Sequence, residues 1–149
     1  MTLEIVRADG FHIGEVGRLF DLYRQFYECA PDRSLATEYI SDRIANEESI
    51  IWVAMDGDVA KGFVQCYSSF CSVEAVKIHI LYDLYVEADE RKTGLGTRLM
   101  NQAQDHAIAD GAKRVDLLTQ HSNQAGQHLY EKLGYEIVNA DFYSYSLNL

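Results

Sequence analysis

The residues best suited to chemistry lie in a basic, Gly-rich turn, Arg91-Lys92-Thr93-Gly94-Leu95-Gly96. The turn follows an apolar stretch, residues 78–86, that is typical of a buried strand. It precedes a helical pattern in which apolar residues recur every four positions from 95 to 107. Glycines let the main chain approach an anion, and the unpaired N–H groups at the start of a helix attract one. The stretch therefore predicts a site for a phosphate-bearing ligand.

Two common phosphate-binding motifs do not fit this turn. The chain contains no Gly-Lys-Ser/Thr, which excludes a GxxxxGK[ST] loop. The dinucleotide fingerprint GxGxxG requires a third glycine at position 99, which is Leu99. The pattern that fits is [Q/R]-x-x-G-x-[G/A], filled by Arg91, Gly94 and Gly96. It resembles the acetyl-CoA-binding signature of the GNAT superfamily of N-acetyltransferases, in which this loop grips the pyrophosphate of the coenzyme.

The expected secondary structure also resembles that family over the whole chain. Strands are expected at residues 3–8, 50–55, 59–67, 78–86, 115–119, 136–138 and 142–147, and helices at residues 16–27, 36–47, 95–107 and 124–133. Residues 68–76 are expected to form a loop. The resemblance implies a mixed α+β fold, with a mostly antiparallel sheet of six to seven strands, about four helices, and a splay between the fourth and fifth strands. We expect one domain over residues 1–149.

A second motif supports the resemblance. The family pattern N-x-x-A-x-x-x-Y-x-x-x-G-[FY] is approached by Asn123, Tyr130 and Gly134. Ala125 stands two residues after Asn123 instead of three, and Gly126 occupies the usual alanine position. Two small residues at this point are expected to keep the helix close to its neighbour.

The resemblance implies acetyl-CoA as the cosubstrate, and no metal. Main-chain N–H groups of residues 92–97 would hold the pyrophosphate, with positive charge from Arg91 and Lys92; Arg98 lies nearby in the sequence. The main chain of residues 84–86 would pair with the pantetheine arm and polarise the thioester carbonyl. The expected coenzyme-binding residues are Leu84, Tyr85, Val86, Arg91, Lys92, Thr93, Gly94, Leu95, Gly96, Thr97, Asn123 and Tyr130.

Two catalytic residues are expected from the resemblance. Tyr130 would be the general acid that protonates the leaving thiolate, although such a tyrosine could also serve as a core residue of an amphipathic helix. Asp83 would be the general base, because polyamine acetyltransferases carry a carboxylate at nearby positions of this strand. Their neighbouring acidic position is Tyr82 here, so a water chain ending on Asp83, Tyr82 or His79 is the alternative.

The acceptor is expected to be a small primary amine, most simply a polyamine or similar cation. Aromatic faces and carboxylates suit an ammonium group, and the expected residues are Phe26, Tyr27, Glu28, Asp32, Tyr82 and Asp83, with Tyr39, Tyr67 and Tyr143 as further candidates. A protein N-terminus or lysine side chain is an alternative acceptor. A non-catalytic acyl-CoA-binding regulatory domain is an alternative of another class. Attack by Cys66 or Cys71 through a covalent intermediate is a further alternative to direct transfer.

Composition limits the partners. The chain of 149 residues has a formal charge of −10 and a pI near 4.8, which argues against nucleic acid or an anionic membrane as the main partner. It has no run of 18 apolar residues and no secretory signal pattern. Its three cysteines show no CxxC spacing, so we expect a cytoplasmic protein. A homodimer is expected, with the tyrosine-rich residues 142–145 as a candidate interface.

Overall fold

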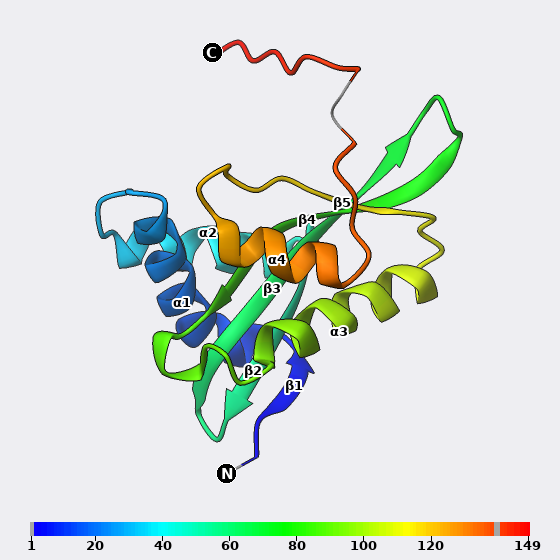
Figure 1. Cartoon of the computed structure of the whole chain (residues 1–149). Coiled ribbons are helices and arrows are strands. Elements are labelled where there is room, and N and C mark those ends of the chain that lie inside the picture. The colour runs from blue at the N-terminus through cyan, green and yellow to red at the C-terminus, as the bar shows by residue number, and fades with distance from the viewer. Residues whose placement is uncertain (1, 139–140) are drawn as a thin grey trace. The chain divides into compact units, whose positions relative to one another are not determined.

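The computed structural model describes residues 2–138 and 141–149, and the chain divides into two compact units, Met1–Leu118 and Thr119–Leu149. The first unit contains one five-stranded sheet in the order β1-β2-β3-β4-β5 (Figure 1). The strands are β1 (Glu4–Arg7), β2 (Ile50–Asp56), β3 (Val59–Cys71), β4 (Val76–Val86) and β5 (Val115–Leu117). The first four pair antiparallel and β5 runs parallel to β4. This is the expected mixed, mostly antiparallel sheet.

Helices cover both faces of this sheet. They are α1 (Ile13–Phe26), α2 (Arg33–Ala45) and α3 (Leu95–Ala109). Phe63 of β3 is fully buried in a core cluster with residues of α1 and α2. A Cβ on the preceding Gly62 would lie 3.1 and 3.3 Å from side-chain carbons of Leu99 and Leu95 of α3. Because successive strand residues point to opposite faces, α1 and α2 cover one face and α3 covers the other.

The hairpin between β3 and β4 is longer than expected. Residues 68–71 do not form a loop; they extend β3 and pair in register from Ser68 opposite His79 to Cys71 opposite Val76. The turn is confined to residues 72–75, with Ala75 at φ 57°. The serines of this segment resemble loop residues because the ribbon has little buried apolar surface, but the ladder of main-chain hydrogen bonds to β4 keeps it extended.

A β-bulge interrupts the centre of β4. Gln65 lies opposite Asp83 whereas Cys66 lies opposite Leu81, so Tyr82 is the extra residue. On the other edge, β5 pairs with β4 only at residues 79–81. Within the first unit, residues 82–86 therefore continue without a β5 partner. The expected splay between the fourth and fifth strands is confirmed, and it begins at the bulge.

The second unit contains α4 (Gln124–Lys132). The Asn123 side chain caps it by accepting from the Gly126 N–H at 3.1 Å, and Gly134 ends it at φ 95°. A Cβ on Gly126 would lie 2.5 Å from Asn123 Nδ2. The small residue at position 126 therefore leaves room for the capping side chain of its own helix, and close packing of α4 against a neighbour remains a prediction.

The two C-terminal strands are not present in the described residues. Residues 135–138 and 141–149 are irregular, and residues 139–140 lie outside the described residues. The side chains of Ile137, Tyr143 and Tyr145 are 81%, 90% and 90% exposed. Alternating apolar residues become a strand only when a neighbouring strand accepts their hydrogen bonds, and the described part of the second unit offers none. The sheet therefore has five strands instead of six to seven. None of the described helices is long and apolar enough to cross a membrane.

Candidate active site

The glycine-rich turn forms an open helix start. It follows the short 3-10 helix η2 (Ala88–Glu90) and places Gly94 at the N-cap of α3 with φ 87°. No side chain caps this end, and the first turn of α3 carries no acidic residue. Thr93 Oγ1 donates to the Glu90 carbonyl at 2.6 Å, which closes the turn. The main-chain N–H groups of Leu95 and Gly96 at the helix start therefore fit an anion such as a pyrophosphate.

Arg91 ties this turn to the end of β4. Its Nε donates to the Val86 carbonyl at 3.0 Å, and its guanidinium lies 5.6 Å from the centre of the Tyr85 ring. The bond uses Nε, so the two Nη groups remain donors suited to a phosphate. Lys92 is exposed and adopts φ 64°, a left-handed conformation that is uncommon outside glycine.

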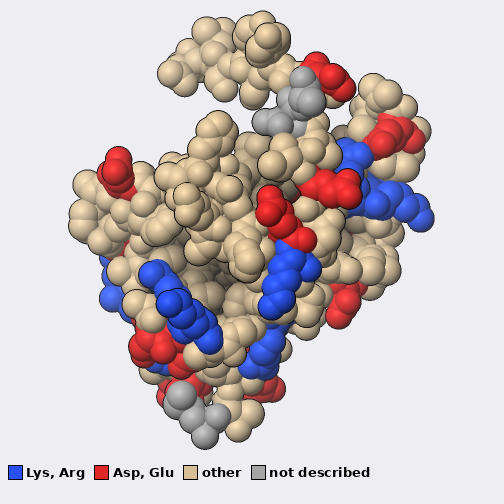
Figure 2. Space-filling view, viewed as in Figure 1, with Lys and Arg blue, Asp and Glu red and all other residues tan. Residues whose placement is uncertain are grey.

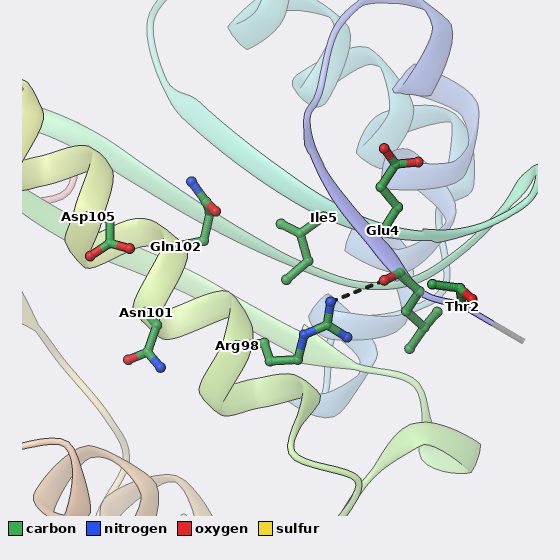
Figure 3. A pocket seen from close by; sticks show the side chains of 8 residues that line it. Thr2, Glu4, Ile5, Arg98, Asn101, Gln102 and Asp105 are labelled. Carbon is green, nitrogen blue, oxygen red and sulfur yellow. Dashed lines mark hydrogen bonds between the residues drawn. The ribbon is translucent and has the colours of Figure 1, made fainter.

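Arg98 is not part of this turn. Its Nη2 donates to the Leu3 carbonyl at 3.1 Å, beside a hollow of about 720 Å³ between β1 and α3 (Figure 3). The guanidinium thus links α3 to the N-terminal strand. On the face viewed in Figure 2, Lys and Arg side chains are interspersed with Asp and Glu.

Asp83 is a buried titratable residue next to the bulge of β4. Its side chain is 7% exposed, and Gln65 Nε2 donates to its Oδ2 at 2.7 Å. Burial raises the pKa of Asp83, and hydrogen bonds from Gln65 and Tyr23 partly oppose that rise. A buried carboxyl with a raised pKa is suited to exchange a proton at moderate pH.

Tyr23 of α1 connects this carboxyl to the bulge. Its hydroxyl donates to the Tyr82 carbonyl at 3.0 Å, a carbonyl that belongs to the extra residue of the bulge. Burial, followed by the negative charge of Asp83, raises the pKa of Tyr23. The phenol therefore stays protonated and remains a hydrogen-bond donor at physiological pH.

Aromatic rings gather beside Asp83 in what we call the tyrosine cluster, namely Tyr23, Tyr27, Tyr39, Tyr67 and Tyr82. The rings of Tyr23 and Tyr27 are 5.1 Å apart, and those of Tyr67 and Tyr82 are 5.5 Å apart. The hydroxyls of Tyr39 and Tyr67 are 2.6 Å apart. Ring faces of this kind attract an ammonium group. The sequence predicts Tyr27, Tyr82, Tyr39 and Tyr67 as separate candidates, and the fold brings them together.

The loop between α1 and α2 holds the remaining expected acceptor residues. Phe26 is 53% exposed, with its ring 5.2 Å from that of Tyr27. Glu28 is exposed at φ 65°. The Asp32 carboxylate caps α2 by accepting from the Leu35 N–H at 3.1 Å. Capping already engages the Asp32 carboxylate, so Glu28 is the more available carboxylate of this loop.

His79 and Cys66 are both buried, and their surroundings argue against a catalytic role. His79 is 1% exposed, its Nε2 lies 2.7 Å from Asp110 Oδ2 of the α3 C-cap, and its ring is 6.0 Å from His106 of α3. It therefore faces α3, away from the tyrosine cluster. Burial raises the pKa of Cys66 to about 12, which leaves a neutral thiol that is a poor nucleophile.

Asn123 and Tyr130 belong to the second unit, so their roles toward β4 remain predictions. Besides capping α4, Asn123 donates from Nδ2 to Thr119 Oγ1 at 3.0 Å. The ring of Tyr130 is 6.1 Å from that of Tyr135, whose N–H donates to the Tyr130 carbonyl.

Three residues around Asp83 were not expected from the sequence, namely Tyr23, Ser49 and Gln65. Tyr23 fits the apolar stripe of α1 and is indistinguishable there from a core residue. Gln65 gave a usable signal, because it is the only strongly polar side chain in the run Gly62-Phe63-Val64-Gln65-Cys66. A buried polar residue in a central strand requires a partner.

Comparisons with known proteins agree with this geometry. The model of the Acetyltransferase (GNAT) family matches residues 16–135. The chain is 40% identical over 147 residues to the uncharacterised N-acetyltransferase YhfO of Bacillus subtilis (strain 168), covering 99% of this chain and 98% of that protein. A crystal structure of a probable acetyltransferase has a TM-score of 0.89 at 29% identity, over 98% of this chain and 97% of the other.

A further solved structure is a predicted acetyltransferase with acetyl-CoA from Clostridium acetobutylicum, with a TM-score of 0.80 at 15% identity over 99% of this chain and 96% of the other. Similarity at that identity shows the shared fold. The family model spans most of the chain, and the bacterial relative matches nearly all of it. The chain therefore belongs to the GNAT family and is an acetyl-CoA-dependent N-acetyltransferase.

Proposed function

We propose that this enzyme transfers the acetyl group of acetyl-CoA directly to the primary amine of a small cation such as a polyamine. The observation that supports it best is the buried Asp83 carboxyl beside the tyrosine cluster, at the point where β4 loses its pairing with β5. Negative aromatic faces attract the ammonium form of the amine, and a carboxyl with a raised pKa can take its proton.

The coenzyme would be held by the turn and by the unpaired half of β4. The N–H groups of residues 92–97 would bind the pyrophosphate, with charge from Arg91 and Lys92. Main-chain groups of Leu84, Tyr85 and Val86 would pair with the pantetheine arm, together with the Asn123 side chain. When bound, acetyl-CoA supplies the reactive thioester.

Asp83 would act on the amine before and during attack. A free alkylammonium has a pKa of about 10.4, so most of it is protonated at neutral pH. The tyrosine cluster would orient the amine, and the Asp83 carboxylate would remove its proton directly or through a water molecule. The neutral nitrogen then bonds to the carbonyl carbon, the C–S bond breaks, and the nitrogen loses a second proton to solvent to leave the neutral amide.

Tyr130 would supply the proton that the departing sulfur needs. A phenol with an ordinary pKa of about 10 is protonated at neutral pH and can donate. Near the acceptor entrance, Glu28 and Phe26 would contact the distal part of a cationic amine, whereas Asp32 mainly stabilises α2.

A homodimer and a cytoplasmic location remain predictions from the sequence. Light scattering after size-exclusion chromatography tests the homodimer.

The deciding experiment measures free-thiol release from acetyl-CoA with a panel of polyamines, aminoglycosides, amino acids and a lysine-containing peptide. Turnover is expected with polyamines and should fall in Asp83→Asn and Tyr130→Phe. Preference for the peptide would favour the alternative of protein acetylation. Tight coenzyme binding with no acceleration by any amine would favour the non-catalytic binding domain instead.

A further inference from the structure

We propose that Gln65 and Ser49 are positioning residues that let Asp83 change its protonation state without leaving a buried polar atom unpaired. The proposal rests on the proposed function, because it assigns Asp83 the role of the base. It concerns Gln65 of β3 and Ser49 in the segment before β2.

A continuous hydrogen-bonded row carries the proposal. Ser49 Oγ lies 2.7 Å from Gln65 Oε1, and Gln65 Nε2 lies 2.7 Å from Asp83 Oδ2. Gln65 is 0% exposed and Asp83 is 7% exposed. The register explains the row, since Gln65 is opposite Ile51 of β2 on one side and opposite Asp83 of β4 on the other. Gln65 therefore has no access to bulk water as a substitute partner.

The ionised state of Asp83 satisfies every member of this row. A carboxylate only accepts, so the amide must present Nε2 to Asp83. Its Oε1 then needs a donor, which is the Ser49 hydroxyl. This is the arrangement in the structure.

The protonated state can satisfy the same row after one rotation of the amide. A protonated Asp83 donates, so Oε1 would turn toward it and Nε2 would turn toward Ser49. A serine hydroxyl donates or accepts with equal ease, so it serves both arrangements. A hydrogen bond is kept on each side in both states, and the bond to the ionised carboxylate is the stronger one because its acceptor is charged. Gln65 therefore favours ionisation without blocking protonation, whereas a fixed cation in its place would favour the ionised state alone.

The remaining titratable neighbours of Asp83 do not disturb this exchange. Tyr23 faces it from α1, and Cys66 and Tyr67 interact with its charge from β3. The hydroxyl of Tyr39 of α2 lies 2.6 Å from that of Tyr67. Burial raises the pKa of Tyr23, Cys66 and Tyr67, so all three remain neutral while the carboxyl titrates.

The test compares Gln65→Met, which keeps the volume and removes both hydrogen bonds, with Ser49→Ala and Ser49→Thr. The pKa of Asp83 is measured by NMR of carboxyl-labelled aspartate, assigned by its absence in Asp83→Asn. The pH profile of kcat/KM is measured in parallel. Gln65→Met should raise the pKa of Asp83 by about one unit, a tenfold change, and move the acid limb of the profile to higher pH by the same amount.

The serine variants test the second half of the row. Ser49→Ala should lower kcat severalfold with little change in KM for acetyl-CoA, because one amide atom is unpaired in either state. Ser49→Thr keeps the hydroxyl and should rescue this loss. Thermal unfolding of each variant shows that the measured enzyme is folded.

The outcomes separate this proposal from the proposed function. A folded Gln65→Met enzyme with an unshifted Asp83 pKa and an unshifted acid limb would overturn the positioning role, even while Asp83→Asn is inactive. Full activity of Asp83→Asn would instead overturn the base itself, and the positioning role with it. Equal kinetic constants for Ser49→Ala and wild type would show that Ser49 has no positioning role.

Discussion

Gln65 of β3 and Asp83 of β4 are cross-strand neighbours whose side chains meet at 2.7 Å inside the protein. Among the described residues, the side chain that donates to this buried carboxyl is the neutral Gln65 amide, and the Tyr23 phenol that also lowers its pKa is neutral as well. A structural carboxylate is usually paired with a cation or exposed to water, because a buried charge is costly. The relationship therefore identifies Asp83 as the residue whose replacement should separate activity from stability.

Replacing Asp83 with Asn should lower kcat at pH 7 by about a hundredfold or more, the usual contribution of a general base. Stability at pH 7 should be unchanged or higher, because the amide keeps its partner Gln65 and the substitution removes a buried charge. Thiol-release kinetics and thermal unfolding measure the two effects. A loss of stability with unchanged kcat would assign Asp83 a structural role.

The ionisation of Asp83 should also appear in the pH dependence of the wild-type enzyme, both in kcat/KM and in stability. The pKa of Asp83 is raised by burial, so kcat/KM should rise with pH through an inflection above about 3.8–3.9, the ordinary value for aspartate. The folded state holds this proton more tightly than the unfolded state. The free energy of unfolding should therefore decrease as pH rises from that ordinary value through the folded pKa. Asp83→Asn should lack both dependences.

Asp110 provides a control for the Asp83 substitution, because it is an aspartate on the other face of the sheet. Hydrogen bonds from Lys77 and His79 lower its pKa to about 2, and its carboxylate is the partner of the buried His79 Nε2. Its contribution to stability is present above the ordinary pKa and is lost as pH falls from about 3.8 to about 2. Asp110→Asn should lower the free energy of unfolding by about 1 kcal/mol and leave kcat unchanged; a large fall in kcat would place this side in the mechanism.

The two ends of α3 allow a controlled test of the coenzyme turn. Gly94 at its start and Gly111 just beyond its end have φ of 87° and 83°, and a Cβ on either would meet nothing within 4 Å. Alanine at each position should cost about 1–2 kcal/mol of stability from left-handed strain. Only Gly94→Ala should also raise KM for acetyl-CoA, because only that end would bind the coenzyme. Equal KM values for both variants would contradict the assignment.

Substitution of Cys66 tests whether the acetyl group passes through a covalent intermediate on this residue or is transferred directly. Burial raises its pKa to about 12 and leaves it 3% exposed, so little thiolate exists at neutral pH. Cys66→Ala should keep kcat close to wild type and lose about 1 kcal/mol of stability from the small cavity. An acetylated Cys66 detected by mass spectrometry, together with an inactive alanine variant, would establish the covalent route.

The order of elements from β1 to α4 and the family were accessible from local patterns. The bounds of α1, β2, β4 and α3 differ from expectation by a few residues. The predicted secondary structure is wrong where the local residue pattern and the observed strand pairing disagree. Residues 68–71 carry polar side chains yet pair with β4, whereas residues 142–147 alternate like a strand yet have no ladder in the described unit.

The glycine-rich turn could be predicted from the sequence alone as a coenzyme site, because its proposed chemistry depends on main-chain groups that are consecutive in the chain. Arg91, Gly94 and Gly96 carry that information within six positions. The surroundings of Asp83, in contrast, depend on contacts between distant parts of the chain. Gln65 of β3 donates to this aspartate, Ser49 of the segment before β2 donates to Gln65, and Tyr23 of α1 lies beside the aspartate. These residues are 18, 34 and 60 positions from Asp83 in the numbering. Cross-strand register, one bulge and helix packing set these distances, and such long-range relations leave no local periodicity to detect.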